Sequence, residues 1–206
     1  MSISAEMVRK LREETGAGMM ECKSALVETN GDAEKARDVL RKKGLAAAAK
    51  KAGRAASEGM VGSYIHPGAK VGVLVEVNCE TDFVAKTAEF QALARDIAMH
   101  VAASSPLYVG KDQVPAEVLE KEKEIYKAQA AGQGKPANVQ EKIAEGKLKE
   151  YYSTFCLLEQ TFVKDPKLTV GQLVQEKIAV IKENIVIRRF ARYRLGEESA
   201  TKAAAE

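Results

Sequence analysis

Few side chains of this chain could act as nucleophiles, general bases or soft metal ligands. No two cysteines form a C-x-x-C pair, and the histidines lack a spacing that would aim two imidazoles at one metal ion. Cys79 belongs to the apolar set of a predicted strand, and Cys156 follows Phe155 in an apolar run, so both are expected to be buried rather than nucleophilic. We therefore expect reduced thiols, no metal and no cofactor. The side chains concerned are Cys22, Cys79, Cys156, His66 and His100.

Phosphate-binding loops and paired carboxylates are equally poorly represented. The glycines at 16–18 and 132–134 lack the strand-loop-helix context and the G-x-x-x-x-G-K-[ST] pattern that cradle phosphate, so they predict turns. The carboxylates at 117–124 follow a solvated helix pattern rather than facing each other across a cleft. The sequence predicts a protein that is not an enzyme. A thiol-dependent hydrolase using Cys156 and His100 stays as an alternative.

One short segment carries residue types that do not suit its predicted location. Residues 81–86, with the sequence TDFVAK, connect a Val-rich strand to an amphipathic helix, and such connections run over the surface. An exposed Phe83 beside Asp82 would resemble an interface anchor. The alternative is that Phe83 folds back as a staple on the following helix, with Asp82 as its cap. His100 lies at the edge of that helix's apolar face, where a hydrogen-bonded structural histidine is the usual interpretation.

A basic run lies between residues 41 and 54, where six lysines and arginines occur without an acidic residue. Such a run could contact phosphates, as in a nucleic-acid-binding or ribosome-binding protein, together with Arg188, Arg192 and Arg194. The alternative is a solvated linker face. The run at 41–54 contains no aromatic residues for stacking, which disfavours a single-strand binder. The sequence therefore predicts no specific nucleic-acid partner.

The elements that position these residues begin with a small helical module. Apolar spacing predicts three short helices within residues 5–44, ended in turn by Gly16, by Asn30-Gly31 and by Gly44. We expect a docking module at 1–45 and a helical or flexible linker at 46–56. A core of about 40 residues is marginal, so the module is expected to lean on a partner or on the rest of the chain.

The pattern then changes to the alternation of strands. Residues 61–65 and 71–79 predict a hairpin across a Pro-Gly turn, and 90–101 an amphipathic helix that covers one face of the sheet. Further helices are expected at 116–131, at 139–155 and after the cap Thr169. Residues 184–195 predict a third strand of an antiparallel sheet, with one mostly apolar and one strongly basic face. The fold class is therefore α+β, with a core at 57–196 and a disordered tail at 197–206.

Length and composition agree with a water-soluble globular protein. The chain has 206 residues, of which 46% are hydrophobic and 30% charged. No apolar stretch is long enough to span a bilayer, and the charged first 14 residues do not resemble a secretory signal. We expect a cytoplasmic location and no membrane partner.

Four short segments, in order along the chain, resemble elongation factor Ts, the guanine-nucleotide exchange factor for the translational GTPase elongation factor Tu. The resemblance covers essentially the whole chain. The segments are TGAGMMECK at 15–23, VNCETDFVA at 77–85, IAMHVAA at 97–103 and TVGQL at 169–173.

This resemblance implies an N-terminal module of ubiquitin-associated (UBA-like) type that docks on the GTPase domain of elongation factor Tu. Arg12, Met19, Met20 and Lys23 would lie on the docking module. Residues 81–84, namely Thr81, Asp82, Phe83 and Val84, would intrude beside the partner's nucleotide and Mg²⁺ site, and His100 would contribute a core contact. The implied role is to bind elongation factor Tu, GDP-bound or nucleotide-free, and to promote exchange of GDP for GTP.

The chain resembles the short form of that family. Longer members carry a second sheet-and-helix subdomain and a protruding coiled coil, whereas residues after 57 leave room for one such core unit. The missing contacts would be absent or supplied by another copy of the chain, as in a homodimer that forms a 2:2 complex with elongation factor Tu.

Overall fold

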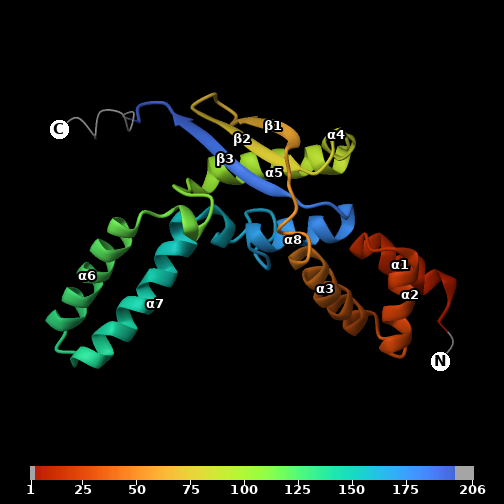
Figure 1. The fold of residues 1–206 in the computed structure, drawn as a ribbon, viewed down its shortest axis with the longest axis horizontal. Coiled ribbons are helices and arrows are strands. Elements are labelled where there is room, and N and C mark those ends of the chain that lie inside the picture. The colour runs from red at the N-terminus through yellow and green to blue at the C-terminus, as the bar shows by residue number, and fades with distance from the viewer. Residues whose placement is uncertain (1–2, 198–206) are drawn as a thin grey trace. The chain divides into compact units, whose positions relative to one another are not determined.

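The computed structural model describes residues 3–197 and combines many helices with one small sheet (Figure 1). The α+β fold predicted from the sequence is confirmed. Of the tail predicted to be disordered at 197–206, residues 198–206 lie outside the described residues.

The chain divides into two compact units, each assembled from separate stretches of sequence. The first unit joins Met1–Gly59, Asn78–Thr87 and Gln172–Val186, and the second contains the remaining residues. The predicted 81–86 segment thus belongs to the same unit as the N-terminal helices. The domain boundaries at 45 and 57 stay a prediction.

Three helices open the first unit, as predicted, and pack on one another around a small apolar core. The Ser4 hydroxyl caps the first helix by accepting from the Met7 N–H, and the Asp32 carboxylate caps the third. The helices are α1 (Ala5–Thr15), α2 (Met19–Glu28) and α3 (Ala33–Ala49). Their core consists of Val8, Leu11, Cys22, Ala25, Leu26, Ala36 and Leu40.

The end predicted for the third helix at Gly44 is wrong, because α3 continues to Ala49. A Cβ at Gly44 would lie 3.0 Å from the Ala179 Cβ of helix α8 (Val170–Ile181). The glycine therefore serves close approach of the two helices rather than helix termination. The helix accordingly takes up the first part of the predicted linker.

The sheet has the order β1-β2-β3, and helix α5 covers one of its faces (Figure 1). The His66 N–H donates to the Val71 carbonyl, and the Leu195 N–H donates to the Lys70 carbonyl, as antiparallel neighbours require. At Gly62 the absent side chain leaves room for Ala94 of α5, whose Cβ would lie 3.2 Å from a Cβ there. The elements are β1 (Glu58–Ile65), β2 (Val71–Cys79), β3 (Val186–Arg194) and α5 (Ala88–Ser104).

The last strand changes phase along its length. Ile187 is buried as the alternation predicts, but Ala191, Tyr193 and Leu195 of the predicted apolar face are exposed. Phe190 and Arg192 are partly covered instead. Because Ile187 and Phe190 are three residues apart, a strict two-residue alternation cannot hold through this stretch.

Two long helices of the second unit form an antiparallel hairpin (Figure 1). Helices α6 (Ala116–Gly132) and α7 (Ala137–Phe155) confirm the predicted helices and are held along their contact by ion pairs of Lys123 and Lys127 with Glu141. A 3₁₀ turn precedes α6 at Lys111–Gln113, and another follows α7 at Leu157–Glu159. Within residues 3–197, none of the helices has the length and apolar character needed to cross a bilayer.

Candidate partner-binding site

The predicted 81–86 connection forms a one-turn helix, α4 (Asp82–Ala85), that buries none of its residues. The Thr81 hydroxyl caps this turn by accepting from the Val84 N–H at 3.4 Å. Phe83 is 78% exposed, so it does not fold back as a staple on the following helix. Thr81 is the N-cap of α4, and Asp82 is the first residue of this short helix.

Asp82 is held as a carboxylate beside this aromatic ring. Its Oδ2 accepts a hydrogen bond from the Lys86 Nζ at 2.6 Å, one helical turn away. That hydrogen bond lowers the pKa of Asp82 below its ordinary value, and the same contact raises the pKa of Lys86. The turn therefore carries an exposed aromatic ring and, at the preceding residue, a carboxylate paired with Lys86.

A buried cysteine supports the turn from below. The Cys79 Sγ donates to the Thr81 carbonyl at 3.1 Å, and burial raises the pKa of this thiol. A thiol kept protonated is a donor rather than a nucleophile. Cys79 is buried, as the sequence predicts, and its hydrogen bond to Thr81 is an addition from the structure.

Sequence reasoning missed the group that holds the turn from outside, the carboxylate of Glu183. It accepts hydrogen bonds from the Glu80 and Thr81 N–H groups and from the Thr81 hydroxyl. The two sides of this contact are 102 and 103 positions apart, so no local pattern could reveal it.

The predicted docking residues lie on the surface of α1 and α2. Met20 is 73% exposed and Met19 46% exposed, although apolar residues at helical spacing are usually buried. Arg12 and Lys23 are exposed as well. Both methionines follow the tight turn that starts at Gly16, whose φ of +66° favours glycine. All four residues belong to the unit that also contains Phe83.

His100 lies in the second unit and is fully buried. Its Nε2 donates to the Gln160 Oε1 at 2.9 Å, and its Nδ1 accepts from the Val163 N–H at 3.3 Å, which is the pattern of a neutral imidazole. Burial lowers its pKa. The partner contact predicted for His100 stays a prediction, and the free chain offers no exposed part of its ring.

The structure argues against the thiol-hydrolase alternative, because neither His100 nor Cys156 is available for chemistry. Both ring nitrogens of His100 are already engaged, so neither is free to take a proton from a thiol. Cys156 is fully buried, and burial raises the pKa of its thiol. All three cysteines are free thiols in buried positions.

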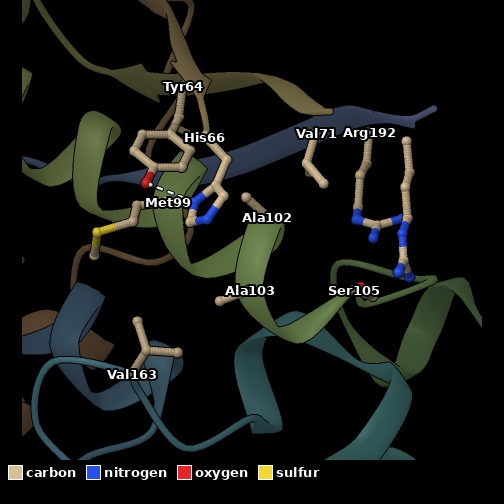
Figure 2. A pocket seen from close by; sticks show the side chains of 10 residues that line it. Tyr64, His66, Val71, Met99, Ala102, Ala103, Ser105, Val163 and Arg192 are labelled. Atoms are coloured by element: carbon tan, nitrogen blue, oxygen red, sulfur yellow. Dashed lines mark hydrogen bonds between the residues drawn. The ribbon is translucent and has the colours of Figure 1, made fainter. Parts of the chain in front are cut away.

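A hollow of about 480 Å³ lies in the second unit, between the sheet and the C-terminal half of α5 (Figure 2). Tyr64 of β1 and His66, the residue after β1, project into it, with the Tyr64 Oη 3.2 Å from the His66 Nδ1. Arg192 enters from β3, and its Nη1 pairs with the Glu197 carboxylate at 2.7 Å. The sequence analysis considered Arg192 only as part of the basic strand face, and no carboxylate is among the residues that line the hollow.

Half of the cations in the basic run form ion pairs with neighbours from their own unit. Arg41 pairs with Glu176, Lys43 with Glu28, and Arg54 with Glu80. Three of its six cations are thus engaged. This favours the interpretation as a solvated face over a phosphate-binding patch.

Residues 33–197 match the family model described as "Elongation factor TS". The chain belongs to the elongation factor Ts family. It is 64% identical to elongation factor Ts of Geobacter sulfurreducens over 96% of this chain and 91% of the relative. It is 62% identical to the protein of that name from Carboxydothermus hydrogenoformans, over 97% of this chain and 92% of the relative.

The similarity to elongation factor Ts includes the N-terminal helices, although the family model begins only at Ala33. The protein of that name from Caldanaerobacter subterraneus is 62% identical over 95% of this chain and 98% of the relative. The uncovered share is far smaller than the module, so Met19, Met20 and the 81–86 turn lie in a chain that matches elongation factor Ts as a whole. The predicted family is confirmed.

Proposed function

We propose that this chain binds elongation factor Tu, in its GDP-bound and nucleotide-free states, and promotes release of GDP so that GTP replaces it. The observation that carries the proposal is the exposed Phe83, presented with the Asp82 carboxylate at the tip of α4. An aromatic side chain fixed on a surface turn is the kind of residue that anchors a protein interface.

The mechanism we propose is displacement rather than covalent chemistry. Phe83 inserts between two helices of the partner and holds them apart. Asp82, kept ionised by Lys86, adds a negative charge close to the bound Mg²⁺ and phosphates. A carboxylate there competes for Mg²⁺ and repels phosphate oxygens, so the bound GDP is weakened. The residues beside them, Thr81 and Val84, complete the inserted turn.

The N-terminal helices supply the docking surface in this proposal. Met19 and Met20 offer flexible apolar side chains that adapt to a partner surface, and exposed methionines are used for this purpose elsewhere. Arg12 and Lys23 flank them with positive charge, which speeds encounter with an acidic patch. Docking of these helices thereby determines where the Phe83 turn contacts elongation factor Tu.

The cycle follows from linkage between the two ligands of the partner. If this chain lowers the affinity of elongation factor Tu for GDP, then GDP lowers the affinity for this chain by the same factor. Incoming GTP, which is bound by the same site, ejects the factor again. No cofactor is needed, and the chain itself performs no bond-making step.

A second copy of the chain is the partner we propose for the uncovered face of the sheet. This face is opposite α5 and presents large apolar side chains that are 49–77% exposed. Such a patch on a sheet is typical of an interface. A homodimer would then form a 2:2 complex with elongation factor Tu. The side chains are Val61, Ile65, Leu74, Tyr193 and Leu195.

Sedimentation tests the homodimer independently of exchange. We expect a species of twice 22.3 kDa, shifted to monomer by Leu74→Glu. Leu107→Glu, at an exposed apolar position away from the strands, is the matched control. A monomer at every working concentration of the unaltered chain would remove the homodimer.

Release of a fluorescent GDP analogue from elongation factor Tu tests the main proposal. We expect the chain to accelerate release, and Phe83→Ala to reduce the accelerated rate about 30-fold, the size of an interface hot spot of about 2 kcal/mol. Leu107→Ala, an exposed apolar residue of the other unit, should match the unaltered chain. Absence of acceleration would refute the exchange function.

A further inference from the structure

The one-turn helix that carries Phe83 has no apolar anchor of its own. It spans four residues and buries none of them, whereas an isolated helix this short is unstable in water. The conformation of this turn must therefore be stabilised by contacts with other segments of the chain.

The Glu183 carboxylate binds the start of this turn with both of its oxygens. Oε2 accepts from the Glu80 N–H at 3.1 Å and from the Thr81 N–H at 3.0 Å. Oε1 accepts from the Thr81 hydroxyl at 2.6 Å, the length of a charge-assisted hydrogen bond. The same hydroxyl accepts from the Val84 N–H, so the order imposed by Glu183 is passed into the helix that bears Phe83.

The contact is reciprocal, which fixes it in two directions. The Glu80 Oε1 accepts from the Asn184 N–H at 2.6 Å, so each strand end binds the backbone of the other with a carboxylate. The Asn184 amide group in turn donates to the Arg54 carbonyl at 2.7 Å. Residues 80–81 and 183–184 are thereby locked together and to the segment that follows α3.

The residue before Glu183 contacts the docking helices. The Lys182 Nζ lies 3.0 Å from the Glu21 Oε1, and the other oxygen of Glu21 accepts from the Gly18 N–H at the start of α2. Lys182 itself has a φ of +68°, a left-handed conformation that ends α8 and turns the chain toward the 80–81 segment. Residues 182–184 therefore contact both the first turn of α2, which carries Met19 and Met20, and the segment that precedes Phe83.

We propose that Glu183 is a positioning residue for nucleotide exchange, and that residues 182–184 set the placement of the Phe83 turn relative to the docking helices. This rests on the proposed function for the identity of the reaction, but the ordering of the turn is a property of the free chain. Glu183 acts through Thr81 and need not touch the partner. A misplaced turn would still allow docking, yet it would insert Phe83 poorly.

Hydrogen exchange of the free chain provides the test that does not depend on exchange activity. Glu183→Gln keeps the size of the side chain but removes its charge. The amide has one oxygen in place of two, so it cannot accept all three hydrogen bonds from the N–H and O–H donors. We expect the amides of residues 80–85 to exchange about tenfold faster, with the amides of α1 and α2 unchanged. Glu176→Gln, which loses the ion pair between Glu176 of α8 and Arg41 of α3, is the matched control. Unchanged protection at 80–85 in Glu183→Gln would overturn the inference.

Exchange kinetics with elongation factor Tu then separate positioning from general damage. We expect Glu183→Gln to lower the maximal release rate about tenfold while the concentration of factor for half-maximal release changes less than twofold. In a Phe83→Ala background the same substitution should have no further effect, because a residue that acts through Phe83 has nothing left to position. Independent, multiplying effects of the two substitutions would overturn the inference. If the unaltered chain fails to release GDP, the proposed function fails, while the hydrogen-exchange result still decides the role of Glu183.

Discussion

The turn around Phe83 and the surroundings of His100 are both organised by side-chain hydrogen bonds, with opposite results. At the turn, the carboxylate of Glu183 orders a backbone segment whose largest side chain remains 78% exposed. Around His100, the Gln160 side chain and the Val163 N–H satisfy a ring that has no exposed surface. The same kind of bond presents a side chain in one region and encloses one in the other.

The two regions illustrate two kinds of residue that are difficult to distinguish in a short sequence segment, namely a buried polar group and an exposed apolar group. A satisfied and buried polar group contributes to stability, because removing it leaves partners without hydrogen bonds in a low-dielectric interior. An ordered and exposed apolar group contributes little to stability and is available to a partner. The two regions should therefore respond differently to matched substitutions.

The largest effect is expected for His100→Ala. It leaves the Gln160 Oε1 and the Val163 N–H without partners and opens a cavity, so the free energy of unfolding should fall by about 3 kcal/mol. Urea denaturation measures this, with the exposed His66→Ala as control. A loss no larger than that of His66→Ala would mean that the buried network is not a stabilising one.

A smaller effect is expected for Thr81→Val, which keeps the shape of the side chain but removes the hydroxyl shared by Glu183 and Val84. Loss of the cap should lower the free energy of unfolding by about 1 kcal/mol. Thr81→Ser retains the hydroxyl and should retain the stability, as urea denaturation can show. Equal losses in both variants would assign the effect to the methyl group instead.

The pH dependence of stability should single out the buried region. Because the folded-state pKa of His100 is lowered, the unfolded chain binds the extra proton first as the pH falls below about 6.5. The stability from the neutral ring is therefore complete above that pH and is lost as the pH falls toward the folded-state pKa. Urea denaturation between pH 7.5 and pH 5.5 should show this decline in the unaltered chain and a weaker one in His100→Gln. Identical declines would show that another group titrates.

The smallest effect is expected for Lys182→Met. Its pair with Glu21 is about half exposed on both sides, so breaking it should change the free energy of unfolding by about 0.5 kcal/mol or less. Thermal denaturation at low and high salt measures the change, which should shrink as salt increases. A large, salt-independent loss would show that Lys182 contributes packing rather than charge.

The local features of both regions could be predicted from the sequence. Helical spacing predicts α5 and the N-terminal helices, and alternation predicts the β1–β2 hairpin, because each pattern repeats over neighbouring residues. Phe83 was singled out for the same reason, since an aromatic residue in a short polar connection breaks the expected pattern. The family follows from four segments that match in order.

The long-range features could not be predicted in this way. Glu183 looks like an ordinary acidic residue after a helix, and only folding brings it to Thr81. Gly44 has the appearance of a helix end, yet its role depends on Ala179 of a distant helix. The change of phase in β3, where burial passes from Ile187 to Phe190 and Arg192, likewise does not follow from the strand's own alternation. Contacts between segments far apart in sequence leave no periodic signal in either one.

The most direct test of the difference between the two regions is the maximal rate of GDP release from elongation factor Tu at saturating factor, measured for Phe83→Ala and His100→Gln at a temperature where both remain folded. We expect a reduction of about 30-fold for Phe83→Ala and a much smaller reduction for His100→Gln. A normal rate with Phe83→Ala together with a large loss in folded His100→Gln would contradict this expectation, and would place the decisive contact at His100.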